Sequence, residues 1–208
     1  MNLPNRITLV RIILIPFMIF FYLASFIPGS WGKIVALGIF IIAALTDMLD
    51  GQIARKRNLV TNLGKFLDPI ADKLLTMAAL LLVVCDGTVP APYGVLAACI
   101  ILGRELIISA FRQVAATKNF VMAADWYGKI KTIVQDISLP ALFLLSFFYS
   151  SGVVTGKGLF AFEIINWVLL GLATLLTIVS GMNYLIKNRA VLKDKKEQTE
   201  QTEENKEN

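Results

Sequence analysis

Residues 47–72 read DMLDGQIARKRNLVTNLGKFLDPIAD, a polar stretch that joins the ends of two apolar segments. These segments, near residues 34–53 and 66–84, are each about long enough to cross the hydrocarbon core of a bilayer, which takes roughly 20 residues. Inside hydrocarbon the backbone finds no water to bond, so a spanning segment must be helical. The stretch therefore predicts two membrane helices joined by a short polar connector.

The rest of the chain repeats this pattern of apolar segments and turn residues. Six apolar segments predict transmembrane helices near residues 8–27, 34–53, 66–84, 93–112, 130–150 and 160–186. Residues 1–186 are thus expected to form one all-α integral membrane domain. Residues 187–208 are rich in Lys, Glu, Gln, Thr and Asn, which predicts a charged, solvated and mostly disordered cytoplasmic tail. The first segment has an alternative start along the membrane surface, because Asn5, Thr8 and Arg11 share one side.

The composition limits the classes of function. Of the 208 residues, 56% are hydrophobic and 17% are charged, and the mean hydropathy is +0.68. Soluble domains carry about 25% charged residues, so these values argue against an ordinary soluble enzyme. The chain contains no histidine, which excludes a Ser-His-Asp triad and a histidine zinc site. Any catalysis must use carboxylates, lysine, arginine or a hard metal ion.

The cationic residues indicate how the chain is oriented. Loops near residues 28–33, 85–92 and 151–158 contain only Lys33 and Lys157 as cations, whereas the other side of the membrane receives most of the rest. The positive-inside rule then places both termini in the cytoplasm. The net charge of +5 is explained by this topology and by attraction to anionic membrane lipids, so we expect no nucleic-acid partner.

Four carboxylates fall within the polar stretch. Asp47 and Asp50 are three residues apart and Asp68 and Asp72 are four apart, so on helices each pair shares a face. Antiparallel helices would bring all four together at the cytoplasmic side, where converging anions need compensation. Hard oxygen ligands suit Mg²⁺, Mn²⁺ or Ca²⁺, and Mg²⁺ usually binds carboxylates together with substrate phosphates. We therefore expect a cytoplasm-facing cavity in which two metal ions clamp a diphosphate.

Pro69 leaves the start of the third segment open. In one reading Asp68 is an N-cap and Pro69 occupies the first helical position. In the other reading the helix begins near Asn62 and Pro69 kinks it. Capping would account for Asp68 but not for the other three carboxylates.

Eight residues of the stretch match the pattern D-x2-D-G-x2-A-R-x8-G-x3-D-x3-D. The matching positions are Asp47, Asp50, Gly51, Ala54, Arg55, Gly64, Asp68 and Asp72. With this pattern the chain resembles the CDP-alcohol phosphotransferase family. Shorter motifs within residues 3–11, 103–112 and 128–135 are similar to the branch of bacterial enzymes that form phosphatidylglycerophosphate.

The resemblance implies a transfer of the phosphatidyl group from CDP-diacylglycerol to sn-glycerol 3-phosphate, with release of CMP. It implies a homodimer in the bacterial cytoplasmic membrane. It also implies that Asp72 is the general base and that the four carboxylates bind Mg²⁺ or Mn²⁺, with two ions per site. The implied contacts to CDP-diacylglycerol are Asn5, Thr8, Gly51, Ala54, Arg55 and Gly64. For the small residues among these, helix packing is the alternative explanation.

Basic residues of the fourth and fifth segments predict the acceptor site. Arg104 and Arg112 are eight residues apart, about 80° around a helix, so they face broadly the same way. Lys129 and Lys131 begin the fifth segment, and the four cations together could hold the phosphate of a small anion. The alternatives are that the lysines only set the topology and that Arg104 forms an ion pair with Glu105 or an aspartate.

Other functions stay open at this stage. The same chemistry could use phosphatidylglycerol, serine or inositol phosphate as the acceptor. Intramembrane acids also line the ion paths of transport proteins, although these acids gather at one side of the membrane. A membrane scaffold without catalysis is the third class, and it predicts that all four aspartates can be replaced by alanine without loss of function.

Overall fold

Six long helices make up the described part of the protein. The computed structural model describes residues 3–56, 62–117 and 126–188, with side chains described in 7–46, 67–115 and 126–188. The helices are α1 (Leu3–Leu23), α2 (Trp31–Lys56), α3 (Asn62–Cys85), α4 (Ala91–Thr117), α5 (Trp126–Ser151) and α6 (Gly156–Lys187), and a 3₁₀ turn η1 (Pro28–Ser30) precedes α2. The described parts contain no β-strand, and five of the six predicted segments each lie within one helix. The first predicted segment, 8–27, runs too far, because α1 ends at Leu23 and residues 24–27 form the turn before η1. The prediction of an all-α fold is confirmed.

The helices α2 to α6 extend beyond the apolar segments that predict them. α2 continues to Lys56 and α3 begins at Asn62, because a helix that leaves hydrocarbon can be solvated by water and no longer needs apolar side chains. α3 contains Pro69 in its interior, so the reading in which the helix begins near Asn62 is right and Asp68 is not an N-cap. Glycine turns connect other helices, as at Gly87, whose φ of 79° is readily adopted by glycine.

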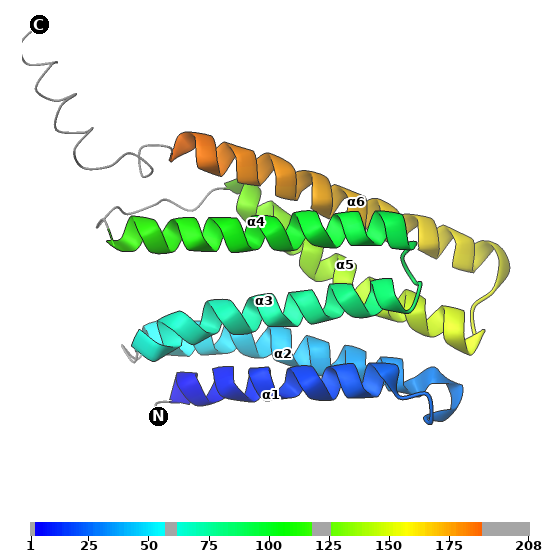
Figure 1. Cartoon of the computed structure of the whole chain (residues 1–208). Coiled ribbons are helices and arrows are strands. Elements are labelled where there is room, and N and C mark those ends of the chain that lie inside the picture. The colour runs from blue at the N-terminus through cyan, green and yellow to red at the C-terminus, as the bar shows by residue number, and fades with distance from the viewer. Residues whose placement is uncertain (1–2, 57–61, 118–125, 189–208) are drawn as a thin grey trace, which may run out of the picture.

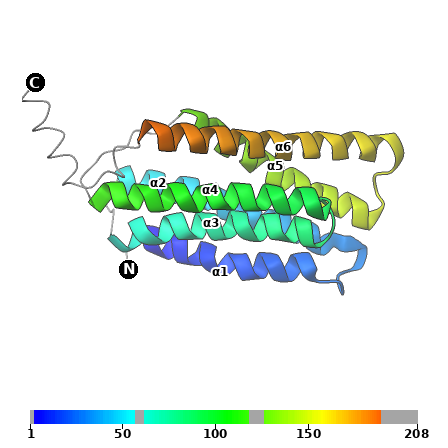
Figure 2. The same ribbon diagram turned by 45° about the horizontal axis from the view of Figure 1, so that its top comes forward.

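The helices form one bundle with two groups (Figures 1 and 2). α1, α2 and α3 lie together, α4, α5 and α6 form the second group, and contacts of α2 with α5 and of α3 with α4 join the groups. The starts of α1, α3 and α5 and the ends of α2, α4 and α6 lie at the same end of the bundle. We call this end the polar end, because it carries the carboxylates and cations singled out above.

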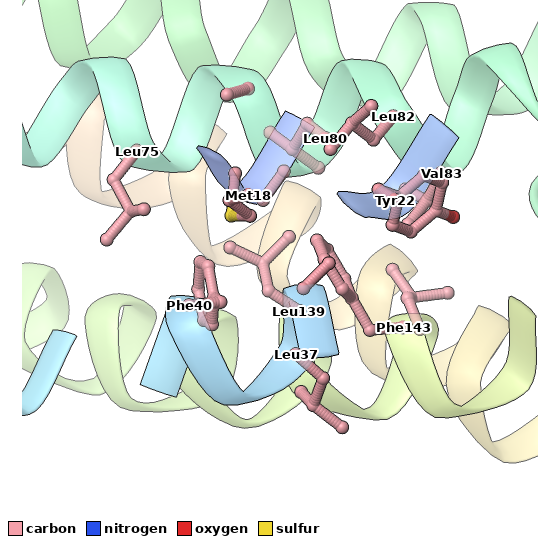
Figure 3. Close-up of a cluster of buried hydrophobic side chains, with 14 of the residues drawn as sticks. Met18, Tyr22, Leu37, Phe40, Leu75, Leu80, Leu82, Val83, Leu139 and Phe143 are labelled. Atoms are coloured by element: carbon pink, nitrogen blue, oxygen red, sulfur yellow. The ribbon is translucent and has the colours of Figure 1, made fainter. Parts of the chain in front are cut away.

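Apolar side chains fill the centre of the bundle (Figure 3). Met18, Phe143 and Leu139 are almost completely buried, and the Phe143 ring lies 5.0 Å from the ring of Tyr22 and 5.7 Å from that of Phe40. The helices approach closely where the sequence has small residues. A Cβ at Gly32 would lie 2.4 Å from the Phe21 carbonyl oxygen, so only glycine allows α2 to start beside the end of α1.

The outer surface of the bundle is apolar, as expected for a protein in contact with lipid. Phe17, Ile42, Leu106 and Val168 each expose half or more of their surface, which would be unfavourable in water. Within the described residues, four segments are long and apolar enough to span a bilayer. They are Pro28–Thr46, Ala91–Ala115, Trp126–Ser151 and Gly156–Lys187, and Ile7–Leu23 is a shorter apolar helix.

These features are those of an all-α membrane protein. α3 carries Asp68, Asp72 and Lys73 in its first half and is not among these apolar segments, so the count of six spans stays a prediction. α1 is one continuous helix from Leu3, and its start along the membrane surface is likewise untested.

A polar network closes the end of the bundle opposite the polar end. In the connection between α3 and α4, the Asp86 carboxylate accepts hydrogen bonds from Tyr22 (2.7 Å) and Lys33 (2.9 Å), and also from Ser146 and Thr88. Burial alone would raise the pKa of Asp86, but these hydrogen bonds together hold its pKa below the usual value. The network ties together α1, α2, α3 and α5 outside the apolar core.

Candidate functional site

A charged cavity of about 440 Å³ lies at the polar end between α3, α4, α5 and α6. Its charged lining residues are Asp72, Lys73, Arg104, Glu105, Arg112, Lys129 and Lys131. Five of these seven are cations, so the cavity has an excess of positive charge and suits a small anionic molecule. The four cations predicted for the acceptor therefore lie in one cavity, and Asp72 lies there with them.

Helical geometry accounts for this convergence. On α4, Glu105, Ser109 and Arg112 follow one another at intervals of four and three residues, so they share the face that borders the cavity. On α3, Asp72 lies one turn after Asp68, and the neighbouring Lys73 donates a hydrogen bond of 2.9 Å to the carbonyl oxygen of Pro69. The side chains thus come from four helices, each of which brings one face to the cavity.

Side chains of α6 hold the two arginines. Arg112 Nε donates a hydrogen bond of 3.1 Å to the Tyr184 hydroxyl, and its guanidinium lies 5.3 Å from the centre of the Tyr184 ring. Arg104 Nη2 donates to the Ser180 hydroxyl at 3.2 Å. A Cβ at Gly181 would lie 2.9 Å from Cγ of Arg104, so glycine at this position leaves the space that the arginine occupies. α6 therefore sets where both guanidinium groups point.

Glu105 and Lys131 form an ion pair between α4 and α5. Lys131 is 1% exposed, and its ammonium group donates to Oε1 of Glu105. Gln135 Nε2 donates to the same oxygen in a long hydrogen bond of 3.5 Å. Lys131 therefore lies in the wall of the cavity with its charge already balanced by Glu105. The ammonium group of Lys129 lies 5.9 Å from the centre of the Trp126 ring.

The start of α1 reaches the site through Asp68. The Thr8 hydroxyl, which is fully buried, donates a hydrogen bond of 2.5 Å to Oδ1 of Asp68. Arg11 is also fully buried, and its Nε donates to the Ala43 carbonyl oxygen on α2 at 3.2 Å. These contacts join α1 to α2 and α3 just where the predicted metal ligands lie.

Several predicted site residues have side chains outside the described ones. They are Asn5, Asp47, Asp50, Gly51, Ala54, Arg55 and Gly64. Their backbones are helical, in α1, the end of α2 and the start of α3, which places them at the polar end. Among the side chains that are described, no three His, Cys, Asp or Glu residues are grouped to hold a metal ion. The convergence of all four aspartates stays a prediction.

Sequence reasoning singled out most of the cavity but not all of it. It treated Glu105 only as an ion-pair partner of Arg104, although the interval from Glu105 through Ser109 to Arg112 is a helical repeat that could have placed Glu105 on the same face. Ser180 and Tyr184 carry no such signal, because each meets its arginine more than 70 residues away along the chain.

Known proteins resemble the chain over most of its length. The model of the family described as CDP-alcohol phosphatidyltransferase matches residues 1–187. A Bacillus subtilis protein named CDP-diacylglycerol–glycerol-3-phosphate 3-phosphatidyltransferase is 39% identical over 92% of this chain and 97% of its own. Proteins of the same name from Shigella flexneri serotype 5b and Rickettsia felis are 36% and 35% identical, over 93% and 88% of this chain and 98% and 93% of their own.

Proposed function

The chain belongs to the CDP-alcohol phosphatidyltransferase family, and we propose that it transfers the phosphatidyl group of CDP-diacylglycerol to sn-glycerol 3-phosphate. The products are phosphatidylglycerophosphate and CMP, which makes the reaction the first committed step of phosphatidylglycerol synthesis. The relatives of that name support this acceptor. The observation that carries the proposal is the cavity in which Asp72 lies together with the cations of α4 and α5.

The cations of the cavity bind the phosphate of the acceptor. Arg104 and Arg112 present planar guanidinium groups that can each donate two hydrogen bonds to phosphate oxygens, and α6 holds both in place. Lys129 adds a third charge at the start of α5. The charge of Lys131 is balanced by Glu105, so Lys131 contributes mainly to the electrostatic potential of the cavity wall. A doubly charged phosphate is therefore favoured over the zwitterion serine and the bulky lipid phosphatidylglycerol.

The carboxylates of α2 and α3 are suited to hard divalent cations. Asp68 and Asp72 lie one turn apart on α3, and Asp47 and Asp50 lie on the last turns of α2 at the same end of the bundle. We propose that these four aspartates hold Mg²⁺ or Mn²⁺, with two ions per site. When bound, the ions would neutralise the diphosphate of the lipid and make its phosphorus easier to attack.

Asp72 is the general base of the proposed mechanism, since it borders the same cavity as the phosphate-binding cations. It accepts the proton of the acceptor hydroxyl while the hydroxyl oxygen forms a bond to the phosphorus that carries the diacylglycerol. The bond from that phosphorus to the oxygen of CMP breaks, and CMP leaves with the electron pair. The displacement is direct, so it requires no covalent bond between the protein and the lipid.

The start of α1, the end of α2 and the start of α3 bind CDP-diacylglycerol in this proposal. The contacting residues are Asn5, Thr8, Gly51, Ala54, Arg55 and Gly64. Thr8 also orients Asp68 through its hydrogen bond to the carboxylate. The lipid thus binds beside the carboxylates of α2 and α3.

We further propose that the protein lies in the bacterial cytoplasmic membrane with both termini and the site on the cytoplasmic side. The excess of lysine and arginine at the polar end supports this orientation. Because the resemblance implies a homodimer, we propose that state as well. Chemical cross-linking of the protein in its own membranes would yield a dimer, and a monomer at all cross-linker concentrations would contradict it.

An acceptor panel tests the proposed function. Purified protein in detergent receives CDP-diacylglycerol and one acceptor at a time: sn-glycerol 3-phosphate, inositol phosphate, serine or phosphatidylglycerol. We expect CMP release with glycerol 3-phosphate and formation of phosphatidylglycerophosphate, measured by chromatography and mass spectrometry. If only an unphosphorylated acceptor reacts, the proposed function is wrong. Ion flux without CMP release would instead favour a transport protein.

A further inference from the structure

One oxygen of Glu105 has no partner among the described residues around the cavity. Lys131 and Gln135 both donate to Oε1, whereas Oε2 is buried and makes no hydrogen bond to any residue that the structure describes. An ionised carboxylate can accept about four hydrogen bonds, and a buried acceptor that stays unpaired is unfavourable. The side chain of Glu105 is 13% exposed and borders the cavity, and rotation about its last bond is easy because that torsion has a broad minimum. Its free lone pairs can therefore reach a donor in the cavity.

The donor must be an uncharged or positive part of the ligand, because a carboxylate repels phosphate. The cations around Glu105 already suit the phosphate of the acceptor, and Asp72 serves the hydroxyl that attacks. sn-Glycerol 3-phosphate has one more hydroxyl, at C2, between the carbon that carries the phosphate and the carbon that carries the attacking hydroxyl. This hydroxyl is the one part of the acceptor that the cations and Asp72 leave without a partner.

We propose that Glu105 accepts a hydrogen bond from the C2 hydroxyl of the acceptor and so determines specificity for a phosphorylated polyol. The inference rests on the proposed function. Lys131 and Gln135 donate to one oxygen of the carboxylate, and rotation about the last bond of the side chain turns the other oxygen toward the ligand. With phosphate bound at the arginines and C2 at Glu105, the terminal hydroxyl is directed to Asp72.

A structural role for Glu105 makes a different prediction. If Glu105 only balances the buried charge of Lys131, its loss disturbs the cavity for every acceptor to the same degree. If it binds the C2 hydroxyl, its loss harms only an acceptor that has this hydroxyl. A comparison of two acceptors on two proteins separates the roles, because a general loss of folded protein cancels in the ratio.

The test uses sn-glycerol 3-phosphate and 3-hydroxypropyl phosphate, which lacks the C2 hydroxyl but keeps the phosphate and the terminal hydroxyl. For the unaltered protein we expect kcat/KM to be about 10- to 100-fold higher with glycerol 3-phosphate, as for a hydrogen bond to a charged group. In Glu105→Gln the ratio should fall about tenfold, because the amide oxygen is an uncharged and weaker acceptor. Glu163→Gln, the same change on α6 near the opposite end, should leave the ratio unaltered.

Two results would overturn the inference. The first is a ratio near one in the unaltered protein, which leaves the proposed function intact as long as glycerol 3-phosphate reacts. The second is an unchanged ratio in Glu105→Gln, with kcat/KM lowered equally for both acceptors. This result would mean that Glu105 only balances the charge of Lys131. If Glu105→Gln fails to fold, the pair Glu105→Met with Lys131→Met removes both buried charges and should show the same fall in the ratio. If neither phosphate reacts, the proposed function itself fails.

Discussion

Replacement of Arg112 by glutamine should weaken binding of the acceptor without affecting the lipid. The Tyr184 hydroxyl and ring occupy one side of the guanidinium, which leaves its terminal nitrogens for phosphate. A hydrogen bond between charged groups contributes about 1.5–3 kcal/mol, and Arg112 lies at the exposed mouth of the cavity, where water and salt screen its charge. We therefore expect the low end of this range, which corresponds to roughly a tenfold fall in kcat/KM for glycerol 3-phosphate.

The assay measures initial rates of CMP release at saturating CDP-diacylglycerol while the acceptor concentration varies. Arg112→Gln should raise the KM for glycerol 3-phosphate, keep the KM for the lipid, and differ less from the unaltered protein at high ionic strength. Lys157→Gln removes an exposed cation at the opposite end and should leave both KM values unchanged. A rise in the lipid KM alone would refute the assignment of Arg112 to the acceptor.

Three further substitutions test other parts of the site and the fold. Asp72→Asn should retain binding of CDP-diacylglycerol, measured by equilibrium binding, but its turnover should fall at least about 100-fold. Full activity in this variant would show that Asp72 is not the general base. Gly181→Leu should displace Arg104, because the Cγ of Arg104 would lie 2.9 Å from the new Cβ. The substitution should lower kcat/KM for the acceptor several-fold. An unchanged kcat/KM would show that α6 does not hold Arg104. Asp86→Asn should cost about 1–3 kcal/mol of stability near neutral pH. Because the pKa of Asp86 is lowered in the folded protein, its contribution to stability is present above the unfolded pKa and is lost as pH falls through the folded pKa. The thermal midpoints of the two proteins should therefore converge in acid. A difference that stays constant with pH would contradict the network.

The helices could be predicted because each apolar segment is long and is bounded by turn residues. The length of a bilayer span fixes the expected helix, and Gly87 supplies the turn between α3 and α4. Hydropathy could not give the true ends of α2 and α3, since it detects where hydrocarbon ends and not where the helix ends. It could not decide between the two readings of Pro69 either, because both are compatible with the local sequence.

The cavity could be predicted in part. The interval of eight residues between Arg104 and Arg112 places both on one face of α4, and the structure brings both to the cavity with Lys129 and Lys131. The pairing of Glu105 with Lys131, and the contact of Tyr184 with Arg112, depend on how α4 meets α5 and α6. A single sequence holds no local signal for such contacts between distant segments.

The most direct measurement for the central claim is CMP release after divalent cations have been removed. The protein is treated with EDTA, freed of the chelator, and assayed with CDP-diacylglycerol and glycerol 3-phosphate before and after addition of Mg²⁺ or Mn²⁺. We expect no detectable CMP without the cation, recovery when it is restored, and no recovery in Asp68→Ala, whose carboxylate is one of the proposed ligands. Equal rates with and without divalent cations would contradict the proposal that carboxylates of α2 and α3 bind metal ions beside the acceptor cavity.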